Sequence, residues 1–266
     1  MPSSRPLAAV TGASSGIGLE LARQFARNGH DVLLVSRGNG LDDAAEAIRA
    51  LGADVQTLAV DLSAADGADQ ALSFFRSQGR PLAAVALNAG VGLGGAFVGG
   101  TALEDELALI QLNIVAAVRL TKGILADMVA SGSGRLLFTS SISATAPIPF
   151  EAVYGASKAF INSFAFALRN EIKDSGVTIT VLMPGPTETN FFHRAGEDDT
   201  QVGAGAKNDA AQVAAQGYVA LMQGLEHVYG GGPEVQHEGE VLNRIESEDQ
   251  KAQRHREWSE PGSAEH

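Results

Sequence analysis

Short apolar runs alternate with longer segments of helical periodicity over most of the chain. The runs are bounded by turn residues and hold few polar positions, which is typical of strands buried on both faces of a sheet. They are Leu7–Val10, Val32–Val35, Val55–Val60, Ala83–Leu87, Leu136–Phe138 and Val177–Met183. The intervening segments predict helices over Gly16–Asn28, Leu41–Leu51, Ala65–Gln78, Leu103–Ala130 and Ala152–Asp174. This alternation predicts an α/β fold, a doubly wound parallel sheet with helices on both faces.

The pattern loosens after Met183. Residues 184–208 contain glycines and acids with no clear period. We expect a helix at about Asp209–Leu225, with Asp209 as its N-cap, and a last short strand at His227–Tyr229. The glycines and proline of 230–233 break the pattern. The sequence therefore predicts one domain over 1–232 and a polar C-terminal tail over 233–266, which could form one helix with a frayed end.

Composition and charge exclude several classes of protein. The chain has 266 residues, of which 45% are hydrophobic and 19% charged, as in globular proteins. Its net charge of −12 disfavours nucleic acid and anionic membranes as partners. There is no apolar run of about 18 residues, so we expect no transmembrane helix. The absence of cysteine excludes disulfides and thiolate metal sites; we expect no metal and a cytoplasmic location.

A glycine-rich segment, Thr11–Gly18, directly follows the first predicted strand and opens the first predicted helix. Its glycines, Gly12, Gly16 and Gly18, suit a tight turn, close approach of a pyrophosphate and close packing of helix on strand. The helix N-terminus would supply N–H groups and a positive dipole to the phosphates. A plain glycine-rich turn is the alternative. The strand–turn–helix context favours a Rossmann-type dinucleotide site.

The end of the second predicted strand indicates which dinucleotide is bound. An acid at this place usually binds the ribose hydroxyls of NAD, but here the residues are Ser36 and Arg37. No carboxylate would repel a 2′-phosphate, and the guanidinium could pair with it, with Ser15 nearby. A lone surface arginine is the alternative. The pattern favours NADP(H).

Tyr154 and Lys158 provide a candidate acid/base pair. Their i,i+4 spacing places both on one helical face. An ammonium about 5 Å from the phenol, at an effective dielectric near 20, favours the tyrosinate by roughly 3 kcal/mol. This would lower the pKa of Tyr154 by roughly two units. Ser141 follows the fifth predicted strand and could hold a substrate oxygen, although Ser140 and Ser143 are equally eligible from chemistry alone.

These segments, in this order, resemble the short-chain dehydrogenase/reductase family. The resemblance rests on Thr11–Gly18, Leu87–Gly90, Asn113, Ser141, Tyr154 with Lys158, and Pro184–Thr187, and extends from about Leu7 to Thr189. It implies an oxidoreductase that transfers a hydride between NADP(H) and a carbonyl or alcohol substrate. The family's serine-to-tyrosine spacing selects Ser141. The family often has a second asparagine where this chain has Leu87.

The resemblance also implies roles for individual residues. Tyr154 is the general acid/base, and Lys158 lowers its pKa and binds the nicotinamide ribose. Ser141 orients the carbonyl, Asn113 holds a water of the proton relay, and Asp61 caps the adenine. The cofactor-binding residues implied are Gly12, Ser14, Ser15, Gly16, Ile17, Gly18, Arg37, Asp61, Leu62, Asn88, Ala89, Gly90, Tyr154, Lys158, Pro184, Gly185, Thr187 and Thr189.

The substrate is less defined than the chemistry. We expect Val91–Gly100, Ile142–Val153 and Phe191–Asn208 to form its pocket; their apolar side chains fit either an apolar substrate or ordinary loop packing. The Tyr-x-x-x-Lys spacing and the glycine pattern differ from those of the enoyl reductase and epimerase branches. A catalytically silent NADP(H)-binding sensor or scaffold, and a dehydratase or isomerase on the same fold, are the alternatives.

Two long predicted helices, Leu103–Ala130 and Ala152–Asp174, indicate self-association. The second carries Phe160, Ile161, Phe164 and Phe166, more large apolar groups than one core-facing stripe needs. The family resemblance implies that these helices pack against their copies. We therefore expect a homodimer or homotetramer.

Overall fold

The computed structural model describes residues 5–265 and contains a parallel sheet of seven strands. The strand order is β3-β2-β1-β4-β5-β6-β7, and every neighbouring pair is parallel. The strands are β1 (Leu7–Thr11), β2 (Asp31–Ser36), β3 (Val55–Ala59), β4 (Leu82–Leu87), β5 (Gly134–Thr139), β6 (Val177–Pro184) and β7 (His227–Gly230). This confirms the predicted doubly wound parallel sheet and each predicted strand.

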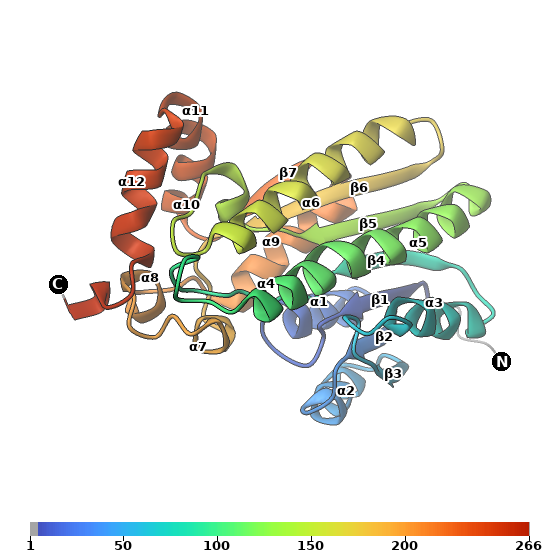
Figure 1. Ribbon diagram of the computed structural model, residues 1–266. Coiled ribbons are helices and arrows are strands. Elements are labelled where there is room, and N and C mark those ends of the chain that lie inside the picture. Colours follow the sequence, from blue (N-terminus) through green and yellow to red (C-terminus); the bar gives the residue numbers. More distant parts are fainter. Residues whose placement is uncertain (1–4, 266) are drawn as a thin grey trace.

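Helices cover both faces of the sheet (Figure 1). The helices packed on the sheet are α1 (Gly16–Arg27), α2 (Leu41–Arg49), α3 (Gly67–Ser77), α5 (Ala117–Ser131), α6 (Ala152–Glu171) and α9 (Ala210–Gln223). One apolar core lies between the sheet and α3, α5 and α6. A second core lies on the opposite face, under α1, α2 and α9. The inner strands, such as β1 and β6, are buried on both sides, which explains their nearly continuous apolar sequences, whereas the edge strand β3 has two exposed residues.

The order of the strands determines where a ligand can bind. The chain adds β2 and β3 on one side of β1 and then returns to place β4 on the other side. The loops that leave β1 and β4 therefore diverge, and they open a crevice at the carboxyl ends of these strands. The glycine-rich segment lies in the first of these loops.

The helix predicted over Leu103–Ala130 is continuous but not uniform. It consists of α4 (Leu103–Ile110), a π-helical segment (Gln111–Ala116) and α5. Over Leu103–Ser131 it is long and apolar enough to cross a membrane by length and composition alone, with a mean hydropathy of 1.4 and 33% of that window buried. The sequence-based expectation of no transmembrane helix stays a prediction. Core and interface helices have the same properties, so this is weak evidence for a membrane span.

The C-terminal tail does not form the single helix that the sequence suggested. It contains α10 (Pro233–His237), a π-helical turn (Glu238–Leu242), α11 (Asn243–Ile245) and α12 (Glu248–Ser259). The break comes at Ser247, whose hydroxyl accepts from the Gln250 N–H while the Gln250 side chain accepts from the Ser247 N–H. This capping box was readable in the sequence as Ser-x-x-Gln. Figure 1 shows α10, α11 and α12 at one end of the sheet, beside α7 (Phe191–Ala195) and α8 (Gln201–Ala204).

Candidate active site

A cavity of about 320 Å³ lies at the carboxyl ends of the strands. It is bounded by the glycine-rich loop, by the first turns of α6, by the segment after β6 and by α12. Its lining includes the predicted residues Gly12, Ser14, Ser15, Gly16, Ile17, Arg37, Asp61, Leu62, Asn88, Ala89, Gly90, Ser141, Tyr154, Lys158, Pro184, Gly185, Thr187 and Thr189. Of the predicted site residues, Gly18 and Asn113 lie behind this surface. Segments that are distant in the sequence therefore meet in one pocket.

The glycine-rich loop has the backbone that its sequence predicts. Gly12 and Gly16 have φ values of 65° and 55°, in the left-handed region that favours glycine. A Cβ on Gly18 would lie 2.2 Å from the Gly12 carbonyl oxygen and 2.5 Å from the Asn88 Nδ2 atom. Asn88 in turn donates to the Thr11 carbonyl oxygen at 3.2 Å. Gly18 therefore permits close packing of α1 on the loop.

Arg37 and Ser36 lie at the mouth of the pocket, where β2 ends. The Arg37 side chain is 78% exposed, with its guanidinium 3.8 Å from the Asp61 carboxylate. The Ser36 hydroxyl donates to the Ser14 hydroxyl at 2.9 Å. The Ser63 hydroxyl, 2.6 Å from Asp61, lowers the pKa of that carboxyl, and Arg37 adds to the effect. The guanidinium is held loosely, so it is available to a ligand.

Tyr154 and Lys158 lie on the first turns of α6, one turn apart and both buried. The Lys158 ammonium is 5.7 Å from the centre of the Tyr154 ring and donates to the Thr139 carbonyl oxygen at 3.1 Å. The Ser141 hydroxyl interacts with the Tyr154 hydroxyl and accepts from the Ser143 N–H at 3.1 Å. These three side chains face one another at the pocket, as the sequence predicted.

The electrostatics differ from the sequence-based expectation. Burial raises the pKa of Tyr154 above its usual value; the Ser141 hydroxyl lowers it, and the carboxyls of Glu151 and Glu197 raise it further. Burial also lowers the pKa of Lys158 to about 8. The prediction that Lys158 lowers the tyrosine pKa by roughly two units was therefore wrong for the protein alone. It considered the lysine but neither the desolvation of the phenol nor the two acids.

Asn113 belongs to the π-helical segment rather than to a regular α-helix. Its side chain accepts from the Val91 N–H at 3.0 Å and donates to the Val91 carbonyl oxygen at 2.9 Å and to the Ser157 hydroxyl at 3.1 Å. A separate cavity of about 20 Å³ borders Asn113, Lys158 and Thr139. A cavity of this size holds about one water molecule.

The pocket contains a wall that the sequence did not predict. Each of the three loops expected to form the substrate pocket contributes to its lining, for example through Val91, Ile148 and Phe191. Four residues of the tail also line the pocket: Glu238, His255, Trp258 and Ser259. The contributing tail residues are polar or amphipathic and follow no apolar period. Nothing in the sequence pattern connected them to the site.

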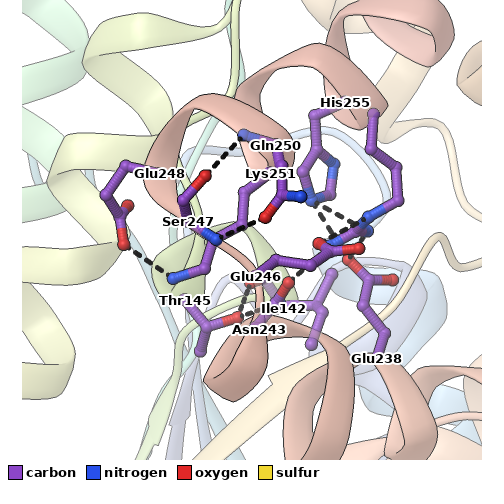
Figure 2. A network of polar contacts seen from close by, with 11 residues as sticks. Ile142, Thr145, Glu238, Asn243, Glu246, Ser247, Glu248, Gln250, Lys251 and His255 are labelled. Atoms are coloured by element: carbon purple, nitrogen blue, oxygen red, sulfur yellow. Dashed lines mark hydrogen bonds and ion pairs between the residues drawn. The ribbon is translucent and has the colours of Figure 1, made fainter.

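A polar network holds this C-terminal wall in place (Figure 2). Arg254 donates to Glu238 at 3.1 Å, to Glu246 at 2.8 Å and to the Asn243 side-chain oxygen at 2.6 Å. The Asn243 amide donates to the Thr145 hydroxyl at 2.7 Å. Thr145 ends the 3₁₀ turn that follows Ser141, so the tail is hydrogen-bonded to the loop that carries this serine.

Comparison with known proteins identifies the family. Residues 6–200 match the family described as short chain dehydrogenase. The chain belongs to the short-chain dehydrogenase family. The match covers every strand from β1 to β6 and ends at the start of α8, so it contains the glycine-rich loop, Ser141, Tyr154 and Lys158.

Similar short-chain dehydrogenases differ in what they bind. An uncharacterised short-chain type dehydrogenase/reductase of Sinorhizobium fredii is 32% identical over 189 residues, 71% of this chain and 73% of that protein. The NADP-dependent 3-hydroxy acid dehydrogenase YdfG of Salmonella typhi is 29% identical over 71% of this chain and 77% of its own. A short-chain dehydrogenase from Sphingobium yanoikuyae in complex with NADPH has a TM-score of 0.79 and 30% identity, covering 90% of this chain and 92% of that one. A Burkholderia phymatum member in complex with NAD has a TM-score of 0.81 but 20% identity, so it supports the fold alone.

Proposed function

We propose that this short-chain dehydrogenase is an NADP(H)-dependent oxidoreductase acting on carbonyl or alcohol substrates, with Tyr154 as general acid/base. One observation carries the proposal: Tyr154, Lys158 and Ser141 line the same cavity as the glycine-rich loop. A silent sensor or scaffold would need the loop but not the three catalytic side chains together. The nicotinamide, when bound, supplies or accepts the hydride.

The described residues fit a dinucleotide. The left-handed Gly12 and Gly16 leave the backbone of the loop open to a pyrophosphate at the N-terminus of α1. Arg37, exposed at the end of β2, suits a 2′-phosphate. YdfG is an NADP-dependent relative, and the NADPH complex from Sphingobium supports the same choice. The NAD-bound Burkholderia structure shows that the fold alone does not determine whether NAD or NADP is bound.

In the proposed reaction the chain's own groups control the proton. The Ser141 hydroxyl orients the substrate oxygen, and the Tyr154 hydroxyl donates its proton to that oxygen in reduction and takes it back in oxidation. The Lys158 ammonium would hold the nicotinamide ribose. Its positive charge, together with that of an oxidised nicotinamide, would favour the tyrosinate form of Tyr154. The small cavity bordered by Asn113 and Lys158 has room for one water, and such a water would resupply the proton of Tyr154.

The direct test is NADPH oxidation followed at 340 nm with a panel of ketones and aldehydes, repeated with NADH. We expect stoichiometric NADPH consumption with at least one carbonyl class. A dehydratase or isomerase would not consume the cofactor stoichiometrically, and a sensor or scaffold would bind NADPH without turnover. Either result would overturn the proposal.

Self-association and location remain predictions. The described surface of α4, α5 and α6 exposes Leu103, Leu107, Val129 and Phe160, with exposed fractions of 63%, 54%, 42% and 39%. This supports the predicted packing of these helices against a second copy. The cytoplasmic location and the division into a domain over 1–232 and a tail over 233–266 also remain predictions, although the tail contributes to the pocket.

A further inference from the structure

Glu151 occupies an unusual position beside the catalytic tyrosine. It precedes α6 directly, three residues before Tyr154, so both side chains lie on the same side of the helix start. The preceding residue, Phe150, has a φ of 64°, which non-glycine residues rarely adopt. The Glu151 side chain is 6% exposed and lines the pocket. A strained turn therefore places a buried carboxyl next to the reacting groups.

Glu151 adjoins a second buried carboxyl, that of Glu197. Glu197 is 1% exposed, and its carboxyl is hydrogen-bonded to that of Glu151. Glu151 also accepts a hydrogen bond from the Ser259 hydroxyl of α12 at 3.2 Å. An ionised carboxylate has about four acceptor sites, and buried polar groups are normally hydrogen-bonded. The pair therefore has acceptor capacity that these contacts do not use.

The other carboxyls of the pocket lining are paired. Glu238 is 3.1 Å from both the Arg254 guanidinium and the His255 imidazole. Burial alone would raise the pKa of Glu238, but His255 and Arg254 lower it. Burial instead raises the pKa of Glu151 to about 7. The carboxylate with unused acceptor sites is therefore Glu151 rather than Glu238.

The surroundings of this acceptor restrict the substrate. An acidic acceptor beside the reacting carbonyl favours a hydroxyl or an ammonium and repels a carboxylate. The apolar part of a substrate can contact aromatic rings, since Phe191 lies 5.4 Å from Tyr154 between ring centres and Trp258 also lines the pocket. The sequence alone had suggested either an apolar substrate or loop packing at these segments, and the acid pair was not foreseen.

We propose that Glu151, whose carboxyl contacts that of Glu197, is a specificity-determining residue. It accepts a hydrogen bond from a hydroxyl or ammonium group next to the substrate's carbonyl carbon. This inference rests on the proposed carbonyl chemistry and names its substrate class. A keto acid with its carboxylate at the same place is a poor substrate. The hydride and proton steps are those of the proposed function; Glu151 exchanges no proton with the substrate, although its carboxyl helps to raise the pKa of Tyr154.

Four phenyl ketones that differ only next to the carbonyl test the inference. They are α-aminoacetophenone, α-hydroxyacetophenone, propiophenone and benzoylformate, which carry an ammonium, a hydroxyl, a methyl and a carboxylate. The readout is the kcat/KM of each donor-bearing ketone divided by that of propiophenone, in wild type and in variants. Comparing this ratio between variants cancels the intrinsic reactivity of each ketone.

Glu151→Leu is expected to lower the ratio at least tenfold for one or both donor-bearing ketones, since a hydrogen bond to a charged group contributes about 1.5–3 kcal/mol. It should also raise the relative rate with benzoylformate. Glu151→Gln separates the two donors: it keeps an acceptor for the hydroxyl but loses the charge that an ammonium needs. A ratio that stays within twofold of wild type in Glu151→Leu would refute the inference.

Glu106→Gln is the matched control. Glu106 is also buried, at 7% exposed, but it accepts from the Thr101 hydroxyl at 2.7 Å and lies outside the pocket lining. This variant should leave the ketone ratios unchanged. Binding of 2-amino-1-phenylethanol and 1-phenylpropanol by calorimetry, in a Tyr154→Phe background with and without Glu151→Leu, gives the same comparison without turnover. Equal preferences in that assay refute the inference, whereas absent turnover with intact preferences refutes the proposed reaction alone.

Discussion

Replacing Glu197 with glutamine should stabilise the protein, and increasingly so as the pH rises. Glu197 is 1% exposed, and the titratable groups that act on it are Glu151 and, more weakly, the Tyr154 hydroxyl. Burial, together with the adjacent Glu151 carboxyl, raises the pKa of Glu197 to about 9, and burial raises that of Glu151 to about 7. The folded protein therefore keeps protons that the unfolded chain releases near pH 4.5.

The sign and size of the effect follow from proton linkage. Below pH 4.5 both carboxyls are neutral in the folded and unfolded chains, so the pair has no pH-dependent cost. Above it the folded state binds more protons, and stability falls by about 1.4 kcal/mol per pH unit for each proton retained. Glu197→Gln removes at least one such proton. The free energy of unfolding of the variant, relative to that of wild type, should therefore increase by about 3 kcal/mol between pH 5 and pH 7. For 266 residues, with about 2.1 cal/mol/K of unfolding entropy per residue, this is about 5 °C in Tm.

The assay is thermal unfolding of wild type and variant at pH 5, 6, 7 and 8, without cofactor. We expect the Tm difference to increase steadily over this range. Glu106→Gln, which loses a carboxylate that accepts from the Thr101 hydroxyl, should lower Tm at pH 7. If the Tm difference between wild type and Glu197→Gln is the same at pH 5 and pH 8, folding does not make Glu197 retain its proton, and the reasoning is refuted.

The remaining predictions concern catalysis, cofactor choice and assembly. Tyr154→Phe should lower kcat by 10²-fold or more while NADPH still binds, and Lys158→Ala should impair both; a phenylalanine variant with more than about a tenth of the wild-type rate would exclude the acid role. Wild type should bind NADPH about 10- to 150-fold more tightly than NADH in fluorescence titrations, and Ser36→Asp with Arg37→Ala should reverse this order; equal affinity of wild type for both cofactors contradicts the assignment. Phe160→Glu should dissociate an oligomer that sedimentation detects in wild type at micromolar concentration, and a monomeric wild type would end that prediction.

The sheet and the reacting residues were predictable because both follow strong local rules. Buried parallel strands produce short continuous apolar runs, and the glycine-rich loop must follow the first of them. Tyr154 and Lys158 need only helical spacing to meet. The switch point then brings Ser141 to the same edge of the sheet. Periodicity and topology therefore predicted the sheet, the glycine-rich loop and the Tyr154–Lys158 pair, whereas the choice of Ser141 over Ser140 and Ser143 rested on the family resemblance.

Other features depend on tertiary contacts that leave no period in the sequence. The π-helical segment that carries Asn113 has the apolar pattern of an ordinary helix. The raised pKa of Tyr154 depends on burial and on two acids, one of them, Glu197, in a segment without regular structure. The sequence predicted only a polar tail that could form one helix, whereas Lys251, His255 and Ser259 of this tail are buried. Its Ser247 capping box was a readable signal that the prediction did not use.

The residues that could be predicted from the sequence and those that could not have different proposed roles in the site. The groups proposed to move the proton and hold the cofactor lie at strand ends and on the first turns of α6, where the fold itself places them. The groups proposed to recognise the substrate are Glu151 and Glu197, which lie on separate segments and are hydrogen-bonded to each other, while Ser259 of α12 donates to Glu151. Substitutions at Glu151 or Glu197 are expected to change the substrate preference without disturbing the sheet, and also to make the pKa of Tyr154 less raised. For that reason the reaction class could be predicted from motifs that resemble the family, whereas the proposed substrate class depends on the contacts of α12 with the start of α6.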